Sequence, residues 1–193
     1  MRISSAIAGF LVVGIAAAQD ATVSDPVSGM KYPASVGTFT RIASGKSDSG
    51  ALTATYRKNN STFTITVSAF ETSTVFAMLG MPKSRADMDK AYCLTGIDRE
   101  SRANASDVAV KDEGDASLRR SGSSRSGYRK SYALTLASFL DSKNVAVHTD
   151  LYRFCMIDNR WTVQYRVDYL PGVEPAADVK MFMRDLEWTI GKP

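Results

Sequence analysis

Residues 150–191 decide the fold, and they read DLYRFCMIDNRWTVQYRVDYLPGVEPAADVKMFMRDLEWTIG. Over residues 161–169 apolar and polar residues alternate, which is the pattern of a half-buried β-strand. Asp158-Asn159 interrupts the pattern where a two-residue turn would connect this strand to the preceding one. After the Pro-Gly pair at residues 171–172, apolar residues recur at the spacing of one helix face. The stretch therefore predicts a strand, a turn, a second strand and a helix.

The register of this hairpin assigns every large apolar side chain to one face of the sheet. The predicted pairs are Ile157 with Arg160, Met156 with Trp161, Phe154 with Val163, and Tyr152 with Tyr165. Paired residues share a face, so the opposite face receives Arg153, Cys155, Thr162, Gln164 and Arg166. The helix then lies on the aromatic face, where each buried side chain contributes roughly 1.5–3 kcal/mol before entropy is subtracted. The residues expected in this core are Phe154, Trp161, Val163, Tyr165, Phe182 and Leu186.

A second predicted hairpin, with Asn59-Asn60 as its loop, follows the same rule. Its pairs are Tyr56 with Phe63, Ala54 with Ile65, and Leu52 with Val67. Ser84, three positions before an acidic residue, is typical of a helix N-terminus and predicts a helix over residues 84–94. We therefore predict an α+β fold, in which an antiparallel β-sheet of hairpins packs against a C-terminal helix. A second helix on the other face of the sheet is left open.

The chain begins with a segment that we interpret as a signal peptide over residues 1–18. Arg2 precedes an almost wholly apolar run, and Ala16-Ala17-Ala18 fits an A-x-A cleavage site. The alternative is a retained membrane anchor, for which the apolar run is short. We expect a periplasmic or secreted protein with no transmembrane anchor after processing. Its net charge of +4 is too small to indicate nucleic-acid binding.

The rest of the chain is predicted to form one domain. Residues 19–32 are rich in Ser, Asp, Pro and Gly and predict a mobile leader. Residues 33–193 form a single α+β domain, with 44% hydrophobic and 23% charged residues in the whole chain, as in ordinary soluble proteins. Around residues 97–130 the apolar period fades among Ser, Gly and Arg, which predicts a flexible basic insert.

Cys93 and Cys155 are the only cysteines in the sequence. In an oxidising compartment an isolated pair favours a disulfide, and two buried free thiols are the alternative. Because the register places Cys155 on the Thr- and Arg-rich face, a bond would bring the helix at residues 84–94 to that face. Bonded cysteines need α-carbons within about 7 Å of each other.

The sequence carries no recognisable catalytic motif, and we expect no cofactor and no metal. His148 is the only histidine, and a single histidine without a partner set is more often structural than catalytic. The acidic clusters at residues 87–89 and 112–115 lack the oxygen spacing of an EF-hand loop, so solvated charge is the simpler interpretation. A hydrolase or other enzyme with its site near His148 is the alternative functional hypothesis.

Five basic residues lie close together without an intervening acidic residue: Arg119, Arg120, Arg125, Arg129 and Lys130. This pattern predicts a contact for an anionic partner, such as a lipid head group, a cell-wall polymer or an acidic protein. A solvated loop that keeps the protein soluble is the alternative. Nucleic acid is not expected, because few aromatic residues lie among these positions.

The order of elements resembles the small exported proteins of the PsbP-like α/β sandwich class. The residues that carry the resemblance are Phe39 with Arg41, the strand through Tyr56, the run WTVQYR at residues 161–166, and FMRDLEW at residues 182–188. The resemblance implies a central antiparallel sheet with helices on both faces and a non-enzymatic accessory role. The basic insert has no counterpart in that class. We therefore expect an exported, non-enzymatic accessory or binding protein of the cell envelope or secretome.

Overall fold

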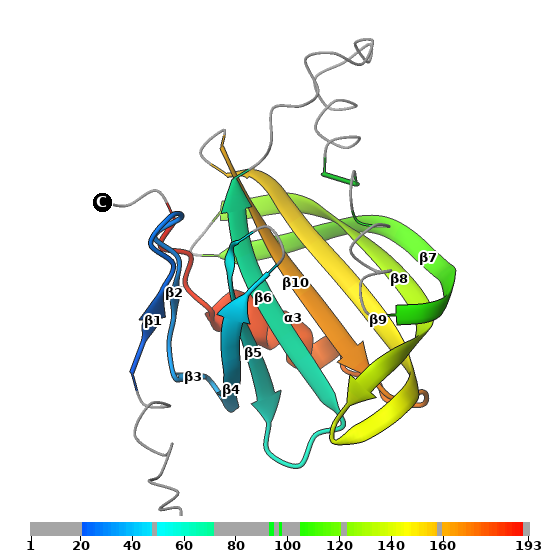
Figure 1. Ribbon diagram of the computed structural model, residues 1–193. Coiled ribbons are helices and arrows are strands. Elements are labelled where there is room, and N and C mark those ends of the chain that lie inside the picture. Colours follow the sequence, from blue (N-terminus) through cyan, green and yellow to red (C-terminus); the bar gives the residue numbers. More distant parts are fainter. Residues whose placement is uncertain are drawn as a thin grey trace, which may run out of the picture.

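The computed structural model describes residues 21–47, 50–71, 93, 94, 97, 105–120, 123–157 and 160–190 (Figure 1). Its elements are β1 (Val23–Ser24), β2 (Lys31–Tyr32), β3 (Ser35–Val36), β4 (Phe39–Lys46), β5 (Leu52–Lys58), β6 (Phe63–Glu71), β7 (Ala105–Arg120), β8 (Ser123–Phe139), β9 (Ser142–Ile157), β10 (Trp161–Tyr169) and α3 (Ala176–Asp185). β1 and β2 form a two-stranded sheet. The other strands form one antiparallel sheet of eight, in the order β3-β4-β5-β6-β10-β9-β8-β7.

The α+β class predicted from the sequence is wrong. Most of the described residues lie in β-strands. Among these residues, α3 is the one helix with defined bounds, and it has ten residues. β7 and β8 have 16 and 17 residues and occupy most of the segment expected to be a flexible insert at residues 97–130. β7 shows no apolar period because it lies at the edge of the sheet with most of its side chains in solvent. Backbone pairing with β8, rather than burial, therefore defines this strand.

The predicted packing of the C-terminal helix on the aromatic face is confirmed. The ring centroid of Phe182 in α3 lies 5.1 Å from that of Phe39 and 5.0 Å from that of Tyr56. Trp188, just after α3, donates a hydrogen bond of 2.6 Å from Nε1 to the hydroxyl of Tyr165. The six residues expected in the core are all buried, at 0–5% exposure: Phe154, Trp161, Val163, Tyr165, Phe182 and Leu186. In Figure 1, α3 lies behind the middle of the sheet.

The central hairpin has the predicted register except at its turn. Phe154 pairs with Val163 and Tyr152 with Tyr165, as expected, but Trp161 pairs with Ile157 because the register shifts between Trp161 and Val163. Such a bulge adds one residue to one strand and changes the local pairing. The turn residues 158 and 159 lie outside the described part of the chain.

The hairpin of β5 and β6 is displaced by two residues from the predicted register. Tyr56 pairs with Ile65 instead of Phe63, and Ala54 pairs with Val67. The turn closes with a hydrogen bond of 3.0 Å from the Ser61 amide to the Lys58 carbonyl, and Asn60 has a φ of 56°. Because side chains alternate with a period of two, a shift of two residues leaves each side chain on its predicted face.

Residues 21–32 are packed against the domain, which corrects the prediction of a mobile leader. Met30 and Tyr32 are fully buried in the core on the α3 side. Thr189, beyond α3, accepts a hydrogen bond of 2.8 Å from the Lys31 amide and donates one of 2.7 Å to the Gly29 carbonyl. The guanidinium of Arg41 donates to the carbonyl oxygens of Tyr32 and Ala21. These partners are distant in sequence, so local composition could not predict them. The predicted signal peptide at residues 1–18 lies outside the described residues.

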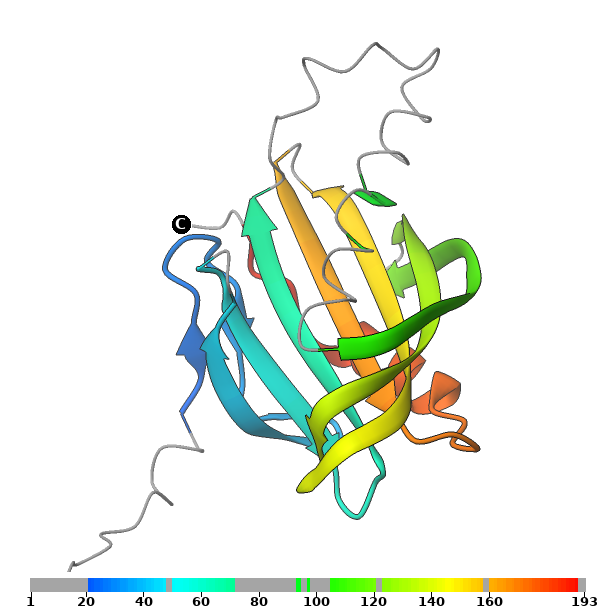
Figure 2. The same ribbon diagram turned by 45° about the vertical axis from the view of Figure 1, so that its right-hand side comes forward.

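The sheet carries a second apolar cluster on the face opposite α3. It consists of Ile97, Tyr132, Leu134, Leu136, Phe139, Val147 and Leu151. β7 and β8 curve away from the other strands (Figure 2), and Leu118 near the end of β7 joins the core on the α3 side. The bend brings Gly127 of β8 close to Phe154 of β9. The two apolar clusters therefore share no residue and lie on opposite faces of one sheet.

Candidate functional site

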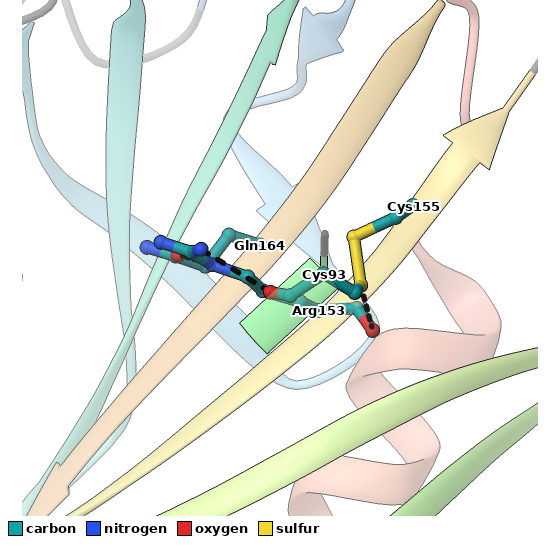
Figure 3. The surroundings of a disulfide bond; sticks show 4 residues. All are labelled: Cys93, Arg153, Cys155 and Gln164. Carbon is teal, nitrogen blue, oxygen red and sulfur yellow. Dashed lines mark hydrogen bonds between the residues drawn. A yellow bond between two sulfur atoms is a disulfide. The ribbon is translucent and has the colours of Figure 1, made fainter. Parts of the chain in front are cut away.

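The Cys93–Cys155 disulfide joins a helical residue to β9, and the sequence-based prediction of this bond is confirmed. The two α-carbons lie 5.7 Å apart, within the limit expected for bonded cysteines, and the sequence separation is 62 residues. Figure 3 shows the bond lying on the face of the sheet opposite α3. The predicted helix at residues 84–94 lies outside the described residues except for Cys93 and Leu94, which are helical. The bond therefore attaches these two residues to the Thr- and Arg-rich face.

Arg153 lies directly beside the disulfide and is only 6% exposed (Figure 3). Its Nε donates a hydrogen bond of 2.5 Å to Gln164 Oε1, and its Nη1 donates one of 3.3 Å to the Cys93 carbonyl oxygen. Its guanidinium also lies 5.7 Å from the centroid of the Phe70 ring, within cation–π range. The Cys93 sulfur lies 3.7 Å from the Arg153 carbonyl oxygen, but a bonded sulfur carries no proton to donate. Arg153 thus connects β9, β10 and the backbone of Cys93.

The polar side chains around Arg153 continue along β9 and β10. Thr149 is fully buried and donates a hydrogen bond of 2.6 Å to Asp168 Oδ1. Arg166 Nε donates to both carboxylate oxygens of Asp168, at 3.0 and 2.9 Å. Among the side chains that the structure describes, every fully buried polar atom has a hydrogen-bond partner. This face therefore combines a satisfied polar network with the apolar cluster that contains Ile97.

A second group of polar side chains lies on the α3 side of β8, β9 and β10, near His148. Asp150 is 8% exposed, and its carboxylate accepts hydrogen bonds from the Ser131 hydroxyl at 2.5 Å and the Tyr169 hydroxyl at 3.5 Å. The His148 ring meets the Tyr169 ring edge-on, with centroids 5.5 Å apart. A serine hydrolase needs its serine hydroxyl within hydrogen-bond reach of a base such as histidine. The Ser131 hydroxyl is instead bonded to Asp150, so this arrangement gives the enzyme hypothesis no support.

The pKa values of the tyrosines and the arginine around Asp150 favour a role in hydrogen bonding over a role in proton transfer. Burial, followed by the charge of Asp150, raises the pKa of Tyr169 to about 12 and also raises the pKa of Tyr152. Burial lowers the pKa of Arg129, but Asp150, Tyr152 and Asp112 outweigh it and the pKa is raised overall. Both tyrosines stay neutral and Arg129 stays charged near pH 7. General acid–base catalysis at neutral pH favours groups with a pKa near 7, which these three groups do not have.

Of the five basic residues singled out in the sequence, the four whose side chains the structure describes do not form one surface patch. Arg129 forms an ion pair with Asp112, and Lys130 Nζ lies 3.5 Å from Glu113 Oε2. Arg119 and Arg125 are exposed near the end of the β7–β8 hairpin. Arg119 pairs with Ser124 and Arg125 pairs with Leu118, so the two arginines lie on opposite faces of the hairpin. Arg120 pairs with Ser123 at the hairpin end.

The acidic cluster at residues 112–115 lies on a regular strand, where Asp112 and Glu113 take part in the ion pairs with β8. No group of three or more metal-ligating side chains occurs among the residues that the structure describes. Residues 87–89 lie outside that set.

Sequence reasoning placed Arg153 on the polar face but did not recognise its role beside the disulfide. Its position two residues before Cys155 puts both on one face of β9, and this signal was available in the sequence. Asp150 carried no such signal, because Ser131 and Tyr169 reach it from two other strands.

Comparison with known proteins adds no relative. No family model matches the sequence, and no curated protein matches it significantly. Within the described part of the chain, no helix has the length and apolar character needed to cross a membrane.

Proposed function

We propose that the protein is an exported, non-enzymatic binding protein of the cell envelope or secretome. The Cys93–Cys155 disulfide is compatible with this location, because such bonds persist mainly in oxidising compartments. The apolar run and the A-x-A site within residues 1–18 support the same hypothesis. The resemblance to the PsbP-like class, itself a hypothesis, also favours an accessory role.

The observation that carries the binding hypothesis is the end of the β7–β8 hairpin. Residues 116–128 contain three arginines and no acidic residue. Arg119 and Arg125 are exposed, and neither forms an ion pair with another described residue. A segment with one sign of charge attracts anions over roughly 10 Å at moderate ionic strength. We infer that this end of the hairpin contacts an anionic envelope component, whereas Arg129 and Lys130 support the hairpin through their ion pairs.

Vesicle binding tests this contact on the processed chain. Co-sedimentation with vesicles of phosphatidylglycerol and phosphatidylcholine is compared with vesicles of phosphatidylcholine alone, and soluble poly-glutamate serves as a competitor that represents acidic protein. We expect binding to the anionic vesicles that weakens with salt and falls several-fold in the Arg119→Gln/Arg125→Gln variant.

The matched control is Lys111→Gln/Lys143→Gln, which removes the same charge at two exposed positions, one eight residues before Arg119 on β7 and one at the start of β9. An equal loss of binding in this control would show that only net charge matters and would contradict the proposed contact.

Intact-mass measurement of the exported protein tests the location separately, and a mass that retains residues 1–18 would contradict processing at the predicted site.

A further inference from the structure

A row of polar side chains crosses β4, β5, β6, β10 and β9 on the face opposite α3. Thr40 pairs with Arg57, and Asp168 pairs with both Thr64 and Thr149. The β5–β6 register pairs Tyr56 with Ile65, and its next position places Arg57 beside Thr64. Tyr56 and Ile65 lie in the core on the α3 side, so Arg57 and Thr64 lie on the opposite face. Polar side chains of five neighbouring strands therefore stand next to one another.

The charge of Asp168 is compensated within this row, whereas the charge of Arg57 is not. Asp168 accepts hydrogen bonds from Arg166 Nε and from the Thr149 hydroxyl. Arg57 is half-buried and forms no hydrogen bond or ion pair with a residue that the structure describes. A guanidinium is always charged at neutral pH and carries five N–H donors. Arg57 and Arg166 against Asp168 thus leave one positive charge without a counter-charge.

Thr64 provides a second, independent observation at the same place. It is only 8% exposed, and its hydroxyl has no hydrogen-bond partner among the described residues. Every fully buried polar side-chain atom in the described part of the chain does have a partner, so solvent or a ligand still reaches the Thr64 hydroxyl. The hydroxyl of Thr66 is instead bonded to that of Thr55, at 2.9 Å. A hydroxyl in so enclosed a position loses free energy unless another group bonds to it.

Arg57 and Arg166 approach Thr64 from two sides. β6 lies between β5 and β10 in the sheet, and neighbouring strands are about 4.8 Å apart, so the two arginines extend from strands separated by about 10 Å. The terminal nitrogens of Arg166 have no partner among the described residues, because only its Nε is bonded to Asp168. Guanidinium groups bind the oxygens of carboxylates and phosphates in fork geometry. An anion above Thr64 would meet donors from three adjacent strands.

We propose that Arg57, Thr64 and Arg166 form a binding site for an oxyanion, a carboxylate or a phosphate group, on the face opposite α3. The two arginines supply positive charge and N–H donors, and the Thr64 hydroxyl supplies a third donor. The pairing of Arg166 with Asp168 removes the negative charge that would repel the ligand. The site goes beyond the proposed contact of the β7–β8 hairpin, with which it shares no residue, and its test uses soluble ligands without vesicles.

NMR titration of the full exported chain tests the site with three soluble probes: methyl phosphate, galacturonate and glucose. The resonances followed are the Nε–Hε group of Arg57 and the backbone amide of Thr66. We expect a saturable shift of both resonances with at least one of the two anions and none with glucose. The anion that saturates them identifies the ligand as a phosphate or a carboxylate. Added sodium chloride should weaken the binding, because the contact is between charges.

Two variants separate the contributions of the charge and the hydroxyl. Arg57→Gln should weaken anion binding by about tenfold or more, and Thr64→Val, which keeps the side-chain shape, by about threefold or more. The matched control is Lys46→Gln, which removes the same charge at an exposed position at the end of β4 and should stay within about twofold of the wild type. Urea midpoints of the variants confirm that each remains folded.

Four results would overturn the proposal. They are the absence of a saturable shift with both anions, an equal shift with glucose, an unchanged affinity in a folded Arg57→Gln variant, and an equal loss of affinity in Lys46→Gln. The Arg57→Gln variant decides the question by itself if Thr64→Val does not fold.

Discussion

Gly127 of β8 lies where the backbone of the hairpin crosses β9. A Cβ atom built at this position would lie 2.6 Å from Cδ1 of Phe154 and would also collide with the Arg153 carbonyl oxygen. One of these obstacles is backbone, so a flexible side chain cannot relieve the clash. We expect Gly127→Ala to lower the free energy of unfolding by about 1–3 kcal/mol or more, measured by urea denaturation.

Gly114 of β7 provides the matched control for Gly127→Ala. Nothing lies within 4 Å of a Cβ built there, so Gly114→Ala should change stability by about 0.5 kcal/mol or less. Equal effects of the two substitutions would show that β8 does not approach β9 as closely as the structure places it.

At the scale of elements, α3 stabilises the core of the sheet mainly through one aromatic side chain. Phe182 is 1% exposed and contacts three rings on three strands: those of Phe39, Tyr56 and Tyr165. Truncation leaves a cavity that these rings cannot fill without moving. Phe182→Ala should therefore destabilise the protein by about 3–5 kcal/mol in urea denaturation.

The control within the same helix is Lys180→Ala, because Lys180 is exposed. The free energy of unfolding of Lys180→Ala should lie within about 0.5 kcal/mol of that of the wild type. A small effect of Phe182→Ala would mean that the sheet keeps its core without the helix.

At the scale of the whole molecule, buried tyrosines make stability depend on alkaline pH. Burial is the main cause that raises the pKa of Tyr32, Tyr56 and Tyr169, the last to about 12, above the ordinary value of 10.0. The neutral tyrosine is thus favoured in the folded state. The buried neutral tyrosines contribute fully to the free energy of unfolding below about pH 10. This contribution decreases as pH rises toward 12, because the same tyrosines ionise at lower pH in the unfolded chain.

Urea midpoints measured from pH 8 to pH 11.5 test this dependence. We expect a constant midpoint up to about pH 9.5 and a steep fall above it. Tyr169→Phe should make the fall less steep, because one tyrosine with a raised pKa is removed. A midpoint that stays constant through pH 11.5 would contradict the burial of these hydroxyl groups.

The sequence by itself determined the central hairpin, the helix that packs on it and the partners of the disulfide. Strict alternation in β10 assigns each of its side chains to a face, so Val163 and Tyr165 could be placed in the core, and Phe154 of β9 followed as the partner of Val163. The pairing of Cys93 with Cys155 needed only their number and an oxidising compartment. These features depend on local periodicity or on a choice between two cysteines.

Only the tertiary structure decided the strand β7, the first part of β8 at residues 123–130, the packing of residues 21–32 and the surroundings of Asp150. An edge strand in solvent has no apolar period, so its pairing partner alone makes it a strand. Residues 29–31 are held by Thr189, more than 150 positions away, and Asp150 receives its hydrogen bonds from β8 and β10. Contacts between residues far apart in the chain leave no periodic trace in the sequence, which is why the fold class was predicted wrongly while the core was predicted correctly.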